Sequence, residues 1–225
     1  MEQSDDSDIA LDTTHNIFCL AAPYPHKNLE IIPRVAKELK NYEGSYKFLL
    51  TLPNKSEIWK NIRDESERLS VEGMIKNIGV LKIAECLDWY KKSNMVFLPT
   101  LLEVFSATYL EAMAMKKPII TSDLDFAREV CGEAAIYFKP HSSLSAAQEI
   151  NRLFSDKDKR IDLITKGEQQ LKKFPTNAQK NEELLNWFRE IISMSLIHIS
   201  EPTRRTHSSY AVFCLKKKNG WGGGG

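Results

Sequence analysis

The chain has 225 residues, of which 42% are hydrophobic and 27% charged, with a formal net charge of +1. No apolar run approaches the roughly 18 residues that a membrane span needs, and the polar, acidic start does not resemble a secretion signal. These features predict a globular chain of the cytoplasm and argue against a nucleic-acid surface. The four cysteines are far apart in sequence, so they predict neither a metal site nor a redox pair.

The charge changes abruptly near the end of the chain. Residues 195–225 hold five Lys or Arg against one Glu, together with five of the ten glycines. The segment SLIHISEPTR at 195–204 resembles the translated end of a sequencing adapter, and YAVFCL at 210–215 resembles a translated flow-cell primer. We therefore expect residues 195–225 to be an unstructured read-through artefact, with a natural basic tail as the alternative.

Between residues 16 and 194, short apolar runs alternate with helical patterns in one predicted domain, after a segment at 1–15 that is expected to be disordered. The predicted strands are 16–22, 46–52, a short strand within 74–80, 95–99, 118–121 and 134–138. The predicted helices are 29–39, 55–69, 84–91, one from about 105, 123–130 with Ser122 or Asp123 as N-cap, 143–154, 159–174 and 177–194. This alternation predicts an α/β fold: a single Rossmann-like domain with a six-stranded parallel sheet and helices on both faces.

The central feature is PTLLEVFSATYLEAMAMKK at 99–117, which turns from a strand pattern into a helix pattern. Ligands bind beyond the carboxyl ends of parallel strands, where this loop lies. If the helix begins near Phe105 or Ser106, the N–H groups of Ser106, Ala107 and Thr108 lie unpaired at the positive end of its dipole. We expect an anion site there, because the sequence contains no glycine-rich phosphate loop.

Two glutamates flank this predicted anion site, Glu103 in the loop and Glu111 in the helix. Eight helical steps would separate them by about 12 Å, more than the roughly 5 to 9.5 Å of hydrolytic carboxylate pairs. They are better spaced to bind hydroxyls at two ends of one elongated ligand. A purely structural role, through dipole and solvation preferences, is the alternative.

The loop at 23–28, after the first predicted strand, should lie at the same edge of the sheet. Lys27 could bind phosphate oxygens there as a point charge. For His26 the sequence leaves two possibilities open, a ligand contact or a solvated loop side chain.

These residues match a known family. The matching segments are PYPHKNLEIIPRVAKEL at 23–39 and a continuous run at 78–140 that includes LPTLLEVFSATYLEAMA at 98–114. They resemble the C-terminal, donor-binding half of a retaining glycosyltransferase of family four, the glycosyl transferases group 1, which has the two-domain GT-B fold. The E-x7-E signature of that family corresponds to Glu103 and Glu111, and the resemblance covers about residues 18–189.

The resemblance implies a role for each matching residue. Lys27 would contact the donor diphosphate, Glu103 the hydroxyls of the transferred sugar, and Glu111 the ribose hydroxyls. Lys27 and Glu103 would be the catalytic residues. Backbone amides would hold the distal phosphate, and the base would lie near residues 78–80. The residues expected at these two places are Phe105, Ser106, Ala107 and Thr108 for the phosphate and Gly79 for the base.

The implied reaction moves a sugar from a nucleotide diphosphate donor to an acceptor hydroxyl with retention at the anomeric carbon, in glycan biosynthesis. The family leads us to expect neither a cofactor nor a metal. The N-terminal acceptor-binding domain is absent from this sequence, so the resemblance implies a fragment that transfers sugar slowly or not at all by itself. Peripheral membrane contact would occur through that missing half.

Two departures from the family pattern concern the donor site. The arginine that often precedes the lysine of the first loop by five or six residues is replaced by Ala22 or Ala21, and the glycine after Phe105 is replaced by Ser106. The missing arginine keeps alternatives open. They are a related GT-B epimerase and a noncatalytic nucleotide-sugar-binding module.

Overall fold

A computed structural model describes residues 14–175, 179, 182 and 185–192. The chain divides into two compact units, Met1–Phe174 and Pro175–Gly225. In the second unit, residues 179, 182 and 185–192 are helical, within the predicted helix 177–194. The predicted artefact at 195–225 and most of the segment 1–15 lie outside the described residues, and the predicted domain boundaries at 16 and 194 stay predictions.

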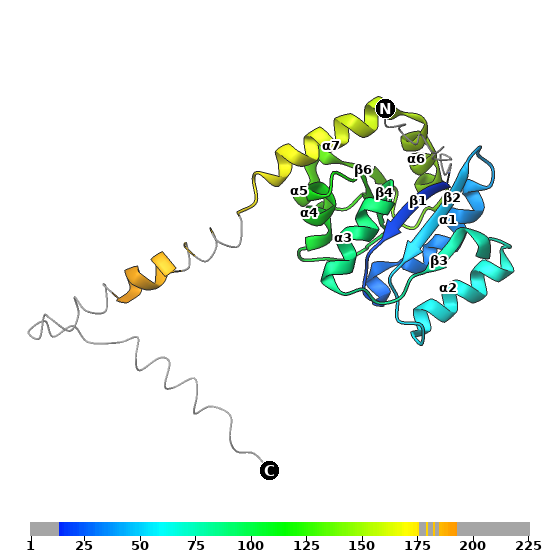
Figure 1. Ribbon diagram of the computed structural model, residues 1–225, viewed down its shortest axis with the longest axis horizontal. Helices are drawn as coiled ribbons and strands as arrows, with labels where there is room; N and C mark the ends of the chain where they lie inside the picture. Colours follow the sequence, from blue (N-terminus) through cyan, green and yellow to red (C-terminus); the bar gives the residue numbers. More distant parts are fainter. Residues whose placement is uncertain (1–13, 176–178, 180–181, 183–184, 193–225) are drawn as a thin grey trace, which may run out of the picture. The chain divides into compact units, whose positions relative to one another are not determined.

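The first unit is built on one parallel sheet with the strand order β3-β2-β1-β4-β5-β6 (Figure 1). All five strand pairs are parallel, which confirms the predicted α/β fold with six parallel strands. The strands are β1 (Thr14–Cys19), β2 (Ser45–Leu50), β3 (Ile75–Asn77), β4 (Met95–Leu98), β5 (Ile119–Ser122) and β6 (Ala135–Phe138).

The first strand differs most from its prediction, because β1 begins at Thr14 and ends at Cys19 instead of spanning 16–22. The predicted disorder of 1–15 was therefore wrong for Thr14 and His15, which pair with β2. After Cys19 the backbone leaves the sheet ladder. The N–H of Ala21 donates to the hydroxyl of Thr51 at 3.3 Å, and the N–H of Tyr24 donates to the carbonyl of Ala22 at 2.8 Å. The apolar residues 20–22 therefore belong to the loop at the carboxyl edge.

Seven helices and four 3-10 turns are described in the first unit. The helices are α1 (Ile32–Leu39), α2 (Glu57–Arg68), α3 (Ile83–Lys92), α4 (Ala107–Ala114), α5 (Asp125–Cys131), α6 (Ser143–Ser155) and α7 (Lys157–Leu171). The 3-10 turns are η1 (Pro25–Lys27), η2 (Leu29–Ile31), η3 (Glu72–Met74) and η4 (Gly132–Ala134). Of the predicted helix 29–39, the first three residues form η2. The α-helix proper begins just before Pro33, which lacks an N–H and suits the first helical turn.

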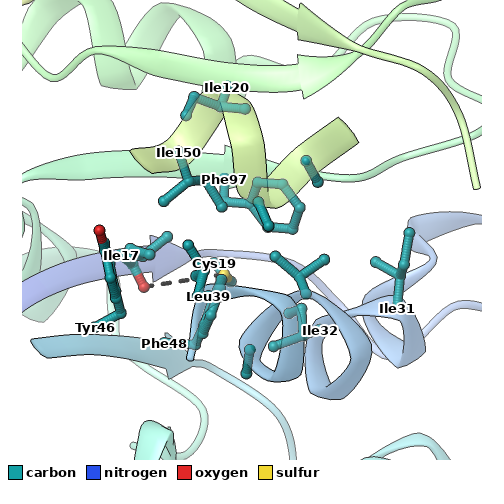
Figure 2. Packing of buried hydrophobic residues seen from close by; sticks show 14 of the residues in the cluster. Ile17, Cys19, Ile31, Ile32, Leu39, Tyr46, Phe48, Phe97, Ile120 and Ile150 are labelled. Atoms are coloured by element: carbon teal, nitrogen blue, oxygen red, sulfur yellow. Dashed lines mark hydrogen bonds between the residues drawn. The ribbon is translucent and has the colours of Figure 1, made fainter. Parts of the chain in front are cut away.

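Alternating strand side chains divide the core into two layers. On one face, Phe97 and Ile120 pack in a cluster with Ile32 of α1 and Ile150 of α6 (Figure 2). On the other face, strand residues such as Phe18 pack with buried residues of α3, α4 and α5. Helices therefore cover both faces of the sheet, as predicted, and leave the carboxyl edge to loops (Figure 1).

The predicted N-cap of α5, Ser122 or Asp123, was wrong. The N-cap is Leu124, and no side chain supplies a capping hydrogen bond there. Ser122 is still the last residue of β5. The carboxylate of Asp123 instead accepts a hydrogen bond from Arg128, which lowers the pKa of Asp123.

Candidate functional site

A cleft of about 620 Å³ opens at the carboxyl edge of the sheet. The loops after β1, β2, β3 and β4 and the first turn of α4 all contribute to its lining. Strand β1 leads to β2 on one side of the sheet, whereas β4 leads to β5 on the other side. The cleft therefore lies where the strand order reverses, the position at which open α/β sheets bind their ligands.

Lys27 and Glu103 meet inside this cleft. The Nζ of Lys27 and the Oε2 of Glu103 form an ion pair, and the two side chains are only 15% and 19% exposed. The loops that carry them are also joined through the backbone, since the N–H of Leu101 donates to the carbonyl of His26 at 2.8 Å. Two opposite charges that lie mostly out of water neutralise each other. An anion that binds Lys27 would release the carboxylate for other hydrogen bonds.

A left-handed residue fixes the position of Lys27. Asn28 has φ +52° and ends the turn η1 (Pro25–Lys27), with its own N–H donating to the carbonyl of Pro25 at 3.0 Å. Asparagine and glycine adopt this conformation far more readily than other residues do. Among the described residues, the buried Nδ2 of Asn28 has no hydrogen-bond partner. Asparagine therefore suits this position because it tolerates the left-handed backbone conformation, and not because its Nδ2 makes a hydrogen bond.

This backbone requirement gives a testable prediction. We expect Asn28→Gly to fold as stably as the original chain, whereas Asn28→Val should lose about 1 to 2 kcal/mol because a β-branched residue is strained at positive φ. Urea denaturation of the two variants measures the difference. Equal stability of Asn28→Val and Asn28→Gly would contradict the assigned role of Asn28.

The helix that was predicted to begin near Phe105 or Ser106 begins at Ala107, with Ser106 as its N-cap. Ser106 has an extended backbone, φ −111° and ψ 115°, and its side chain makes no capping hydrogen bond. The first-turn amides therefore belong to Ala107, Thr108 and Tyr109, one residue later than predicted. Tyr109 N–H donates to the Ser106 carbonyl at 3.3 Å, and Thr108 lines the cleft.

Glu111 lies in a neighbouring cavity of about 550 Å³, which shares Leu20 with the cleft. Its Oε2 accepts a hydrogen bond from the hydroxyl of Tyr90 at 3.0 Å. Burial, reinforced by the negative charge of Glu111, raises the pKa of Tyr90. Glu103 and Glu111 therefore line two neighbouring cavities that share Leu20.

Of the remaining predicted residues, His26 lines the cleft, whereas Phe105 and Gly79 are not among its lining residues. Phe105 is 46% exposed, and its ring centroid lies 6.1 Å from that of Phe174. Gly79 forms a turn after β3 with φ +81°, and its neighbours Val80 and Leu81 line the cleft in its place. His26 also lines the cleft, with its ring stacked on Tyr24 at 5.5 Å.

Sequence reasoning missed two residues of this region. Thr51 is 6% exposed, and its hydroxyl accepts a hydrogen bond from the N–H of Ala21, so that it joins two loops that line the cleft. A polar residue near the carboxyl end of the predicted strand 46–52 was the available signal. Tyr90 had no such signal, because an aromatic residue on an amphipathic helix is typical of a core position.

Ala21 and Ala22 line the cleft. One of these two residues stands where the family pattern described above often has an arginine. Within the described residues, His, Cys, Asp and Glu side chains nowhere gather in threes that could hold a metal ion. Every described helix is too short or too polar to reach across a bilayer. Metal-free chemistry, a cytoplasmic location and the absence of nucleic-acid contact stay predictions.

A family model and one curated protein match the sequence. The family model described as glycosyl transferases group 1 matches residues 2–170. The O-antigen chain mannosyltransferase of Salmonella typhimurium is 23% identical over 134 residues, which cover 60% of this chain and 37% of that protein.

Two solved structures share the fold. The Anabaena protein HepE, in complex with UDP and glucose, has a TM-score of 0.69 at 16% identity, covering 79% of this chain and 48% of that one. The C-terminal domain of the glycosyl transferase group 1 family protein LpcC from Francisella tularensis has a TM-score of 0.62 at 21% identity, covering 71% of this chain and 85% of that domain. The chain therefore spans less than half the length of the Salmonella and Anabaena proteins.

Proposed function

Because the chain belongs to the glycosyl transferases group 1 family, we propose that it is the donor-binding half of a retaining glycosyltransferase of family four. Its ligand is a nucleoside diphosphate sugar. One observation carries the proposal: a cation, a carboxylate and the first turn of a helix converge on one cleft at the reversal of the strand order. They are Lys27, Glu103 and the turn that contains Thr108.

The diphosphate, the transferred sugar and the ribose of the donor each have a partner in this arrangement. The diphosphate binds the first-turn amides of α4 and the Nζ of Lys27, which together supply positive charge. Glu103, released from its ion pair with Lys27, accepts hydrogen bonds from the sugar hydroxyls. Glu111, in the neighbouring cavity, accepts hydrogen bonds from the ribose.

The proposed reaction breaks the bond between the anomeric carbon and the diphosphate oxygen, while the acceptor oxygen forms its bond on the same face of the sugar. The acceptor proton passes to the departing phosphate. Negative charge grows on the diphosphate during this step, so Lys27 and the α4 terminus stabilise the transition state more than the bound donor. In this scheme no side chain acts as nucleophile and no metal takes part.

Transfer also requires an acceptor site. The chain spans 48% of the Anabaena protein, and we place the acceptor site, together with any peripheral membrane contact, on a second domain of the GT-B fold. The described chain alone would then bind donor but transfer sugar slowly or not at all. Similarity to an O-antigen chain mannosyltransferase supports a hexosyl donor and a role in surface-glycan synthesis.

A second candidate is a noncatalytic nucleotide-sugar-binding module. The observation that favours it is the methyl lining of the cleft at Ala21 and Ala22, because these residues offer no charge to a diphosphate. Such a module would bind the donor yet release no free nucleoside diphosphate when an acceptor and a second GT-B domain are supplied. Release of nucleoside diphosphate under those conditions would favour the enzyme.

The proposal is tested by calorimetric titration of the full chain with UDP, GDP, ADP and CDP and with their glucose or mannose derivatives. We expect one base to bind, and Glu111→Ala to weaken that binding about tenfold through loss of the ribose contacts. Glu129→Ala, which removes the same charge from an exposed position on α5, is the matched control. No binding at all, or equal losses in both variants, would refute the proposal.

A further inference from the structure

We propose that Tyr90 is a positioning residue for donor binding. Its phenol holds the Glu111 carboxylate in the orientation in which that carboxylate accepts hydrogen bonds from the ribose hydroxyls. The inference rests on the proposed function, since it requires that Glu111 contacts the ribose. It adds a residue of α3 to a site that otherwise consists of loops and α4.

The hydrogen bond joins the buried hydroxyl of Tyr90 to the exposed carboxylate of Glu111. Tyr90 is 1% exposed, whereas Glu111 is exposed on the surface of α4. The hydroxyl of Tyr90 on α3 donates to Oε2 of Glu111 on α4 at 3.0 Å, and the two residues are 21 positions apart in sequence. An exposed glutamate ordinarily samples several rotamers, and ordering such a side chain on binding costs affinity. The phenol removes that cost by ordering the carboxylate in advance.

The phenol itself is held rigidly. The ring of Tyr90 meets that of Phe18 of β1 edge to face, with centroids 5.0 Å apart and an interplanar angle of 85°. The backbone carbonyl of Tyr90 accepts hydrogen bonds from the N–H of Ser93 at 3.2 Å and from the hydroxyl of Ser93 at 2.8 Å, which fixes the end of α3. The hydroxyl of Tyr90 is therefore positioned by packing on the central strand β1 and by the end of α3, both of which belong to the core of the fold.

The chemistry of the pair suits a ribose. Burial and the charge of Glu111 raise the pKa of Tyr90, so the phenol stays protonated and remains a donor at physiological pH. A carboxylate can accept about four hydrogen bonds, of which Tyr90 uses one. The other described side chains around this cavity are apolar or carry sulfur, among them Leu20, Ile83 and Leu87. The two hydroxyls of a ribose would thus find their acceptor oxygens on Glu111.

The test measures nucleotide binding to Tyr90→Phe and to the original full chain by calorimetry. Two ligands are used: whichever of UDP, GDP, ADP and CDP binds the original chain most tightly, and the 2′,3′-dideoxy form of that nucleotide. Tyr90→Phe keeps the ring and its packing on Phe18. We expect it to bind the ribonucleotide about three- to tenfold more weakly, the factor for ordering one flexible side chain. Its affinity for the dideoxy nucleotide should equal that of the original chain.

A double variant and a control complete the test. Tyr90→Phe should cause no further loss in a Glu111→Gln background, because the contact that it orients is already impaired. Tyr137→Phe removes a phenol that donates to the carbonyl of Gly132 at 2.6 Å, away from both cavities, and should leave binding unchanged.

The outcomes separate this inference from the proposed function. If Glu111→Ala weakens ribonucleotide binding but Tyr90→Phe does not, Tyr90 has no positioning role and the proposed function stands. Equal losses of Tyr90→Phe for the ribonucleotide and the dideoxy nucleotide would mean that the residue is merely structural. If the original chain binds none of the four nucleotides, both proposals fail.

Discussion

Replacement of Lys27 by alanine is expected to weaken binding of the nucleoside diphosphate about 10- to 100-fold. A hydrogen bond between charged partners is worth roughly 1.5 to 3 kcal/mol, and Lys27 is only 15% exposed, so little solvent screens it. The loss also leaves the carboxylate of Glu103 unpaired beside the diphosphate, where its negative charge repels the ligand. Calorimetric titration measures the effect.

Two further variants sharpen this prediction. Lys27→Ala combined with Glu103→Gln should recover part of the lost affinity for a nucleoside diphosphate, because the repelling charge is gone. Lys47→Ala removes the same charge from a hollow that it shares with Lys76 and Lys92, beside the first residues of β1. If Lys47→Ala weakened binding as much as Lys27→Ala, the diphosphate would be attracted by overall charge and not by the cleft.

Replacement of Phe97 by alanine is expected to lower the free energy of unfolding by about 3 to 5 kcal/mol. Phe97 lies on the central strand β4 and is fully buried. Its ring centroid lies 5.4 Å from that of Phe138 and 6.0 Å from that of Phe48, so the substitution opens a cavity under both neighbours. Such a loss is a large fraction of the 5 to 15 kcal/mol that stabilises a typical domain. Urea denaturation followed by circular dichroism measures it.

Phe97→Leu keeps most of the buried volume and should lose distinctly less than Phe97→Ala. Val104→Ala removes an apolar side chain that is 98% exposed, and it should change stability by less than about 0.5 kcal/mol. If Phe97→Ala lowered the free energy of unfolding no more than Val104→Ala does, the packing described for the helices on β4 would be contradicted.

The fold was accessible from the sequence because its strands are short apolar runs separated by amphipathic helices. Strand β4, for example, is MVFL, with all four residues buried, and it ends one residue before the predicted end. The ends of elements were harder to predict. Residues 20–22 are at least as apolar as β1 itself, and their departure from the sheet is seen in the hydrogen bonds from Ala21 to Thr51 and from Tyr24 to Ala22. Likewise, the position of Asp123 before a helix pattern is typical of an N-cap, but its carboxylate pairs with Arg128 instead.

For the candidate site, the sequence located the loops but not the contacts across them. The strand order brings Lys27 and Glu103, 76 residues apart in sequence, to the same edge. Their ion pair depends on side-chain packing that no sequence pattern encodes. The hydrogen bond from Tyr90 to Glu111 depends in the same way on how α3 and α4 pack on the sheet. The roles of Lys27, Glu103, Glu111 and the α4 terminus in donor binding stay predictions.

The most direct test of the central claim is a crystal structure of the chain with the nucleoside diphosphate that binds it. We predict that the distal phosphate lies against the N–H groups of Ala107 and Thr108 and within hydrogen-bond distance of the Nζ of Lys27. The ion pair between Lys27 and Glu103 should then be broken. A nucleotide found elsewhere, for instance in the hollow of Lys47, Lys76 and Lys92, with that ion pair intact, would contradict the claim.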